Sequence, residues 1–320
     1  MKYRFIPLLF LLLMLPTLSK EDMVAFSLIN ENTSSIGILD LRDGREEILT
    51  PPNLYFNPSW SPDGSEIVFY QWQFPQIAYI VDLHSRQIRK LTFKDPKISA
   101  TAMRYPSWSP KGDKILFSGH VYLPFLTLGL FTVRPDGSEV KRIDGTGHDD
   151  KYPSWSYDER KIAFTRSDDI FIIDLRTNEL TPITRTPTVR EAYPMWAPGE
   201  YRIAYTSYDP QTGENSIHIY DLVRKRDMKL KLPKGLALCQ MGKVDWLPDG
   251  RRLVFSAEED DSPPNLYIID VSGNRVEQLT RDLNEGKQTP DWWGGYTAVK
   301  PLNLLNTLWS SIKTKGVGLR

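Results

Sequence analysis

A short motif centred on tryptophan recurs along the chain, and no other feature constrains the fold as strongly. Its fullest copy, residues 58–64, reads Pro-Ser-Trp-Ser-Pro-Asp-Gly. A tryptophan in a fixed slot every 40 to 50 residues or so, about the length of one propeller blade, is typical of a repeat architecture. The chain is therefore predicted to consist of one repeated unit. The marker tryptophans are Trp60, Trp108, Trp155, Trp196, Trp246 and Trp292, with spacings of 48, 47, 41, 50 and 46 residues.

Each of the first five motifs is followed by the pattern of an antiparallel hairpin. Seven residues after the tryptophan comes an apolar residue, and two positions later an aromatic one, so both lie on one face of a strand. Proline presets φ and glycine accepts a positive φ, so the residues between the tryptophan and the strand form a tight turn. The pairs are Ile67/Phe69, Ile115/Phe117, Ile162/Phe164, Ile203/Tyr205 and Leu253/Phe255.

Two more strands complete each repeat. Third strands are expected at 78–83, 130–133, 170–175, 217–222 and 266–271, each followed by a polar turn and a short fourth strand. Four antiparallel strands in a repeat of about 40 to 50 residues are the sequence form of a propeller blade.

The two ends of the chain complement each other. Residues 24–27, 36–41 and 47–50 read as second, third and fourth strands with no first strand before them, whereas Pro290-Asp291-Trp292 reads as a first strand alone. The C-terminal strand is therefore predicted to pair with the N-terminal strands. The result is an all-β, six-bladed β-propeller with four antiparallel strands per blade and a closed ring, which removes exposed sheet edges.

Composition and missing motifs narrow the function. The chain has 40 Lys and Arg and 40 Asp and Glu residues, and this zero net charge argues against a nucleic-acid binder. Its single cysteine, Cys239, is expected to be a small buried hydrophobe. No nucleophile elbow, zinc-protease motif, P-loop or dinucleotide-binding glycine pattern occurs. No cofactor is therefore expected, and a non-catalytic role is favoured.

The N-terminus has the pattern of a secretory signal. Lys2 and Arg4 precede an apolar run over 5–15, and small residues follow at Thr17 and Ser19. The run is shorter than the roughly 20 residues that span a bilayer, although an uncleaved anchor is the alternative. We expect a signal peptide at 1–19 and an exported protein, periplasmic or extracellular.

The propeller is predicted to cover residues 20–298, and residues 299–320 to form a C-terminal tail. Leu304, Leu308 and Ile312 follow one another at intervals of four, which predicts a short amphipathic helix in the tail. The tail either packs on the propeller or docks a partner.

The pattern Pro-x-Trp-Ser-Pro-Asp-Gly-x-x-Ile-x-Phe resembles the TolB-type, WD40-like β-propeller repeat, which also occurs in prolyl-oligopeptidase-like peptidases. The resemblance covers about residues 23–293 and implies a periplasmic or extracellular six-bladed propeller that binds proteins. TolB carries an α/β domain before its propeller, and residues 20–50 are not expected to hold one. Two copies depart from the pattern, since Val244 replaces a proline and residues 157–160 read Tyr-Asp-Glu-Arg.

Two groups of residues are candidates for ligand sites. The marker tryptophans could line a channel, but six in one slot are expected to pack between blades, each burying about 150 to 250 Å². His148, Asp149 and Asp150 are the best metal candidates, although adjacent side chains rarely face one point. Their expected role is structural, capping the turn through side-chain bonds to the backbone.

One face of the propeller is the predicted binding surface. It carries the segments that enter each first strand and the loops that join second to third strands. Trp72, Phe74, Tyr122 and Phe125 would be its anchors, because aromatic residues concentrate binding energy. The alternative is that the aromatics pack under their loops and the charges are merely solvated. The candidate residues are Trp72, Phe74, Arg104, Tyr105, His120, Tyr122, Asp149, Asp150, Tyr152, Arg190, Glu191, Tyr193, Glu258 and Asp260.

The sequence therefore favours an exported, non-catalytic scaffold for a protein partner, with no nucleic acid and with membrane contact only through an uncleaved signal. The alternative is a propeller lyase or hydrolase acting on a polysaccharide, with a metal near His148. A third hypothesis is a calcium-stabilised structural module of a larger envelope assembly. Loop chemistry varies freely on a fixed set of blades, so the sequence does not identify the partner.

Overall fold

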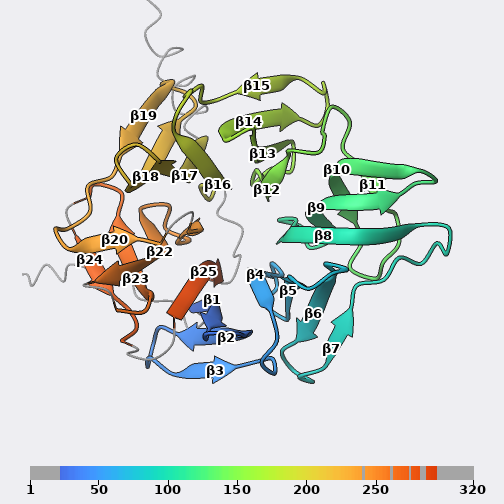
Figure 1. The fold of residues 1–320 in the computed structure, drawn as a ribbon, viewed down its shortest axis with the longest axis horizontal. Coiled ribbons are helices and arrows are strands. Elements are labelled where there is room, and N and C mark those ends of the chain that lie inside the picture. Colours follow the sequence, from blue (N-terminus) through green and yellow to red (C-terminus); the bar gives the residue numbers. More distant parts are fainter. Residues whose placement is uncertain (1–21, 240–241, 260–261, 274, 282–285, 294–320) are drawn as a thin grey trace, which may run out of the picture.

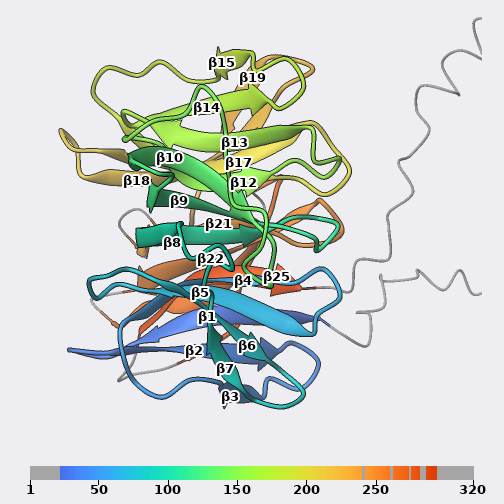
Figure 2. The ribbon, with the colours of Figure 1, turned by 90° about the vertical axis from the view of Figure 1, so that its right-hand side faces the viewer.

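The computed structural model describes residues 22–239, 242–259, 262–273, 275–281 and 286–293. Within these ranges the regular secondary structure consists of β-strands alone, and the strands form six sheets arranged around a central axis (Figure 1). Seen from the side, the ring is a thick disc with connections at both of its faces (Figure 2). The predicted six-bladed β-propeller is confirmed. The predicted signal peptide and C-terminal tail lie outside the described residues.

The blades are numbered 1 to 6 from the first complete one, and each runs outward from the axis. Blade 1 consists of β4 (Tyr55–Trp60), β5 (Glu66–Gln71), β6 (Ala78–Asp82) and β7 (Ile88–Lys90). Blade 2 consists of β8 (Ser99–Trp108), β9 (Ile115–Tyr122), β10 (Leu126–Val133) and β11 (Lys141–Arg142). Blade 3 consists of β12 (Lys151–Trp155), β13 (Lys161–Arg166), β14 (Asp169–Asp174) and β15 (Leu180–Pro182).

The other three blades follow the same plan. Blade 4 consists of β16 (Arg190–Trp196), β17 (Arg202–Asp209), β18 (Glu214–Asp221) and β19 (Arg226–Lys229). Blade 5 consists of β20 (Leu236–Leu238), β21 (Val244–Trp246), β22 (Arg252–Glu259), β23 (Asn265–Asp270) and β24 (Val276–Gln278). Blade 6 consists of β25 (Gly286–Trp293), β1 (Met23–Ile29), β2 (Ser34–Asp40) and β3 (Glu46–Ile48).

The ring closes in blade 6, as predicted. The innermost strand β25 pairs antiparallel with β1, so that Val24 lies opposite Trp292. The Ser27 and Thr289 hydroxyls, 262 residues apart in sequence, form a buried hydrogen bond of 2.8 Å. Both ends of the propeller therefore share one sheet.

Blade 5 departs from the repeat because its innermost strand is split. The short strands β20 and β21 both pair with β22, with Leu238 opposite Ala257 and Val244 opposite Phe255. Cys239 lies at the break and is buried, and this burial raises the pKa of its thiol to about 12. The prediction that Cys239 is a small buried hydrophobe is confirmed.

The core consists of apolar clusters between neighbouring blades, and the marker tryptophans belong to them. The side chain of Trp108, for example, shares a cluster with Val68 and Ile80 of blade 1. The prediction that tryptophans pack between blades is confirmed for the five below, each of which lies in such a cluster. These are Trp60, Trp108, Trp155, Trp196 and Trp246, all 3–8% exposed.

Candidate functional site

Two hairpin connections on neighbouring blades carry exposed aromatic side chains. Trp72 and Phe74, between β5 and β6, are 50% and 79% exposed, and Phe125, between β9 and β10, is 79% exposed. Tyr122 and Leu126, at the adjoining strand ends, are 39% and 50% exposed. These five residues form the aromatic patch. Their side chains face solvent instead of packing beneath their own loops.

Polar contacts join the β5–β6 hairpin of the aromatic patch to strand β8 of blade 2. The Gln76 side-chain amide donates to the carbonyl of Trp72 at 3.0 Å, and its oxygen accepts from Arg104 Nε on blade 2. His120 is half-buried on β9 near Arg104, and its burial together with the charges of Arg104 and His148 lowers its pKa. The predicted site residue Arg104 thus contacts the β5–β6 hairpin through Gln76, and His120 lies on the strand that ends at Tyr122.

A β-bulge recurs in the innermost strands, at the residue before the motif proline. Asn57, Tyr105, Tyr152, Tyr193 and Thr289 have φ values of 51°, 53°, 54°, 54° and 49°. A positive φ is uncommon outside glycine, and the pairing register shifts at each of these places. Because a bulge re-aims side chains, these five positions can be directed toward the axis of the ring.

Three predicted site residues meet at this level of the axis. The ring centroids of Tyr105 and Tyr152 are 4.4 Å apart, and those of Tyr152 and Tyr193 are 3.9 Å apart. The cavity that they line, together with residues of blades 1 and 5, measures only 20 Å³. Burial raises the pKa of Tyr105 and of Tyr193. The tyrosines therefore pack the axis and leave about enough room for one water molecule.

A buried ion pair lies beside the tyrosines. Lys243 occupies the slot of the tyrosine in blade 5, and its Nζ pairs with Asp291 Oδ1 of blade 6. The other carboxylate oxygen of Asp291 accepts from the Trp60 backbone N–H at 2.8 Å. One carboxylate thus connects blades 5, 6 and 1. Removal of either partner would leave an uncompensated buried charge.

The side chains of the three candidate metal ligands do not converge on one point. His148 Nδ1 lies 2.7 Å from Asp149 Oδ1, and both side chains are more than half exposed. Asp150 is buried, and its two oxygens accept from Arg166 Nε and Nη2 at 2.6 and 2.7 Å. Across the described ranges, no three His, Cys, Asp or Glu side chains are grouped so as to hold a metal ion.

The remaining predicted residues are scattered. Arg190 is exposed at the start of β16, with its Nε 3.8 Å from Asp168 Oδ2. Glu258 is half-buried near the end of β22, and Asp260 lies outside the described residues. Glu191 is 3% exposed and lines a cleft between blades 3 and 4. Among the acidic residues predicted for the binding surface, only Asp260 therefore lies outside the described residues.

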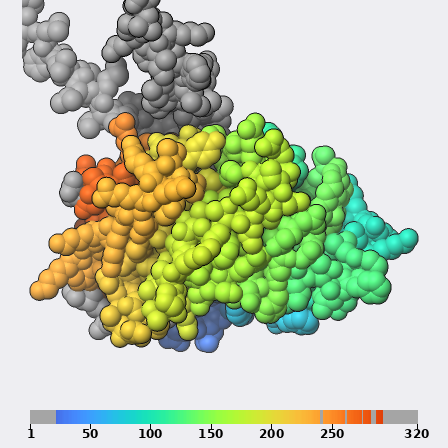
Figure 3. Space-filling model, turned by 90° about the horizontal axis from the view of Figure 1, so that it is seen from above, coloured from blue at the N-terminus to red at the C-terminus, as the bar shows by residue number. Residues whose placement is uncertain are grey.

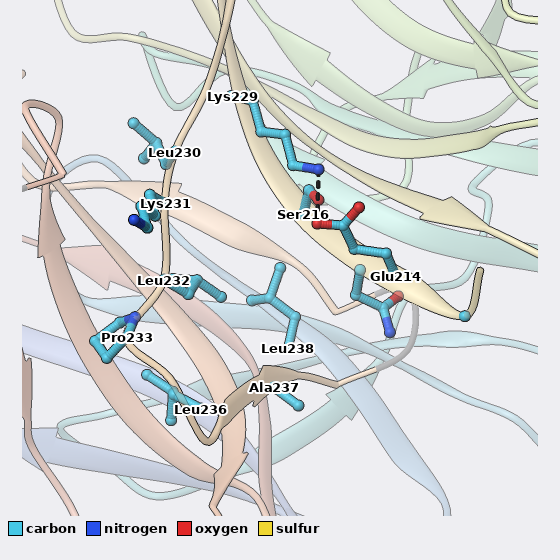
Figure 4. A pocket seen from close by; sticks show the side chains of 12 residues that line it. Glu214, Ser216, Lys229, Leu230, Lys231, Leu232, Pro233, Leu236, Ala237 and Leu238 are labelled. Carbon is cyan, nitrogen blue, oxygen red and sulfur yellow. Dashed lines mark hydrogen bonds and ion pairs between the residues drawn. The ribbon is translucent and has the colours of Figure 1, made fainter.

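Sequence reasoning missed a groove of 520 Å³ between blades 4 and 5. Leu230, Leu232 and Leu236 line it, and an ion pair of 2.7 Å between Lys229 and Glu214 lies at one side (Figure 4). The groove borders the segment that leads to the split strand of blade 5. The one sequence signal was the spacing of 50 residues between Trp196 and Trp246, the longest in the chain.

The fold and its packed axis define a closed six-bladed β-propeller whose last strand, β25, completes the sheet of β1, β2 and β3. The sequence matches the TolB beta propeller domain over residues 10–212. The chain therefore belongs to the TolB β-propeller domain family. No curated protein matches the chain. No helix among the described residues has the length and apolar character needed to cross a membrane.

Solved structures share this fold at low sequence identity. TolB from Acinetobacter baumannii is 18% identical with a TM-score of 0.69, and the alignment covers 85% of this chain and 66% of that one. A protein assigned as TolB from Agrobacterium tumefaciens is 16% identical with a TM-score of 0.61, with coverages of 85% and 99%. An oligogalacturonate lyase from Vibrio parahaemolyticus is 12% identical with a TM-score of 0.55, with coverages of 80% and 79%.

Proposed function

We propose that this protein is an exported, non-catalytic scaffold that binds another protein through its loop face. The loop face is the face that carries the connections between second and third strands and the segments that enter β4, β8, β12, β16 and β20. The observation that carries the proposal is the aromatic patch on blades 1 and 2. Export is supported by the charged and apolar pattern of residues 1–19.

The aromatic patch has the chemistry of a binding hot spot. Large exposed apolar groups gathered on neighbouring hairpins are unfavourable in water and mark interaction sites. Trp72 and Tyr122 offer flat, rigid surfaces of the type that dominates interface energies. The axis, by contrast, is filled by Tyr105, Tyr152 and Tyr193, so the patch is the better candidate for a large partner.

The polysaccharide lyase or hydrolase hypothesis has weaker support. The structural likeness between this chain and an oligogalacturonate lyase, at 12% identity, concerns the fold alone. The geometry around His148 does not favour it, because Asp150 is buried against Arg166 and points away from a shared ligand position with His148. Metal analysis of purified wild-type protein and of His148→Ala tests it, since a stoichiometric metal lost in the variant would favour the enzyme.

An affinity pull-down from the envelope fraction of the producing cell tests the scaffold function. We expect the full chain to retain a specific protein, and the Trp72→Ala/Phe74→Ala/Phe125→Ala variant to lose it at least tenfold. Val223→Ser is the matched control, because Val223 is 76% exposed on the β18–β19 connection at the opposite face. Equal retention by all three proteins would contradict binding through the aromatic patch.

A further inference from the structure

The interface between blades 3 and 4 has an unusually small apolar core. Its cluster contains four buried residues, Ala163, Ile172, Trp196 and Ile203, whereas the cluster between blades 4 and 5 contains thirteen. A cleft of 330 Å³ lies beside it and is lined by β17, β18 and the segment that enters β16. The outer strands of these blades, β15 and β19, face the viewer in Figure 3. We name this cavity, which Glu191 and His218 line, the blade 3–4 cleft.

The repeat itself shows that the wall of this cleft is exceptional. His218 lies opposite Tyr205, and in four other blades the corresponding residue is aromatic and not titratable near neutral pH. Asp227 lies opposite Tyr220, and the corresponding residue is aliphatic in three other blades. The aromatic equivalents of His218 are Tyr79, Phe131, Phe171 and Tyr267, and the aliphatic equivalents of Asp227 are Ile88, Leu180 and Val276.

These polar residues form a connected network. His218 Nδ1 lies 2.7 Å from Asp227 Oδ2, and His218 Nε2 lies 3.1 Å from Ser207 Oγ. The hydroxyl of Tyr205 donates to the other Asp227 oxygen at 2.9 Å. Each side chain of the wall is thus held in one orientation by its neighbours.

The Ser207–His218–Asp227 arrangement matches the residue types of a nucleophilic triad, but its setting does not suit acyl transfer. That chemistry needs hydrogen-bond donors aimed at the developing oxyanion. Ser207 lies within the central strand β17, paired with Glu191 on β16 and with Ser216 on β18. Its backbone is therefore part of the sheet ladder, and the network is better suited to shape a binding wall.

Glu191 has one carboxylate oxygen in this cleft without a hydrogen-bond partner. It is 3% exposed, and its Oε2 has no hydrogen-bond partner although the side chain lines the cleft. The pKa of Glu191 is raised to about 7, mainly by burial. Asp169 and Asp227 also raise this pKa, whereas a hydrogen bond from Thr184 and the nearby His218 lower it. A buried carboxylate with an unused oxygen is costly unless a cation or a donor completes it.

We propose that the blade 3–4 cleft accepts one basic side chain, the ammonium of a lysine or the guanidinium of an arginine, with Glu191 as its counter-ion. The basic group belongs to the bound protein, and in this respect the inference rests on the proposed scaffold function. The cleft opens toward the loop face, since Asp209 and Glu214 of the β17–β18 hairpin line it. Its 330 Å³ lies near the lower end of the range of about 300 to 1,000 Å³ for ligand pockets, which suits a single side chain.

The charges that surround the carboxylate favour a cation. Asp169 on β14 and Asp227 on β19 raise the pKa of Glu191, and His218, which lowers it, already lies 2.7 Å from Asp227 Oδ2 through its Nδ1. Arg185 and Lys229 also line the cleft, and Lys229 is paired with Glu214 at 2.7 Å. A ligand cation would therefore find at Glu191 an acceptor that the protein leaves open.

Calorimetric titration of the full chain with N-acetyl-arginine amide at pH 8 tests the cleft without a partner protein. We expect saturable one-to-one binding, at least tenfold weaker for Glu191→Gln and unchanged for Glu179→Gln, an exposed control on the opposite face. The neutral isostere N-acetyl-citrulline amide should bind at least tenfold more weakly. Binding near pH 6 should also release a proton, which titrations in two buffers measure.

Three results would overturn the inference. They are no saturable binding by the wild type, equal binding by a folded Glu191→Gln variant, and equal binding of the citrulline probe. The double variant His218→Phe/Asp227→Leu gives a second reading, because it restores the residue types of the other blades and should also abolish binding. Loss of probe binding leaves the pull-down through the aromatic patch unaffected, so failure of the cleft and failure of the scaffold function are distinguishable.

Discussion

Blades 2 and 4 have the same architecture but different chemistry at the same slots. In blade 2, Phe117 and Phe131 stack with centroids 5.7 Å apart and planes at 19°. In blade 4, Tyr205 and His218 stack at 5.0 Å and 20°. The backbone therefore holds one ring pair in the same geometry in both blades. A polar residue in a slot that is apolar in the other blades is therefore a better indicator of function than a conspicuous motif residue.

The largest loss of stability is expected when the stacked phenylalanine pair of blade 2 is disrupted. Phe117→Ala removes a fully buried ring from the cluster between blades 1 and 2, and should destabilise the protein by about 3–5 kcal/mol. Urea unfolding followed by tryptophan fluorescence measures the change. A loss below about 1 kcal/mol, the typical size for an average substitution, would mean that this core is not packed as described.

The next largest effect is the pH dependence of the free energy of unfolding that is caused by Glu191 in blade 4. The folded protein holds the Glu191 proton up to a pKa of about 7, whereas the ordinary value is 4.5. The raised pKa of Glu191 therefore contributes to the free energy of unfolding. This contribution is complete below pH 4.5 and is lost as the pH rises through 7, on the order of 3 kcal/mol in all.

The measurement is the free energy of unfolding of wild type and Glu191→Gln between pH 4 and 8.5. The difference between the two proteins should shift in favour of the variant as the pH rises. A difference that stays constant across this range would show that Glu191 titrates normally. Taking the difference also removes the contributions of other carboxylates such as Asp174, whose pKa is lowered by Lys161.

A smaller effect should follow when blade 4 is converted to the chemistry of its neighbours. His218→Phe/Asp227→Leu replaces a partly exposed ion pair by apolar residues, which should leave stability unchanged or raise it by about 1 kcal/mol. Thermal unfolding at pH 7 measures it. A marked loss of stability would show that the network is structural and would weaken its interpretation as a binding wall.

The sequence predicted the blades because the repeat is written in residues that the backbone requires. Proline and glycine define the turn after each tryptophan, and the Ile67/Phe69 type of pair gives one buried face of a strand. Ring closure could be predicted as well, since residues 24–50 lacked a first strand and residues 290–292 supplied one. These are local patterns with a fixed period.

The site could be predicted only in part, because its features depend on backbone detail and on contacts between repeats. The bulge before the motif proline gathers Tyr105, Tyr152 and Tyr193 on the axis, and no periodicity indicates a positive φ there. Glu191 was predicted for the loop face and is buried between blades. Aligning the copies slot by slot would have singled out His218 from the sequence alone.

Site-specific photo-cross-linking in the producing cell tests whether a partner protein binds at the loop face. A photoreactive side chain replaces either Phe74, in the aromatic patch, or Val223, on the opposite face, and both positions are more than three-quarters exposed. We expect a single discrete cross-linked protein from position 74 and none from position 223. Cross-linking that is absent from position 74, or equal at both positions, would contradict a scaffold that binds its partner through the loop face.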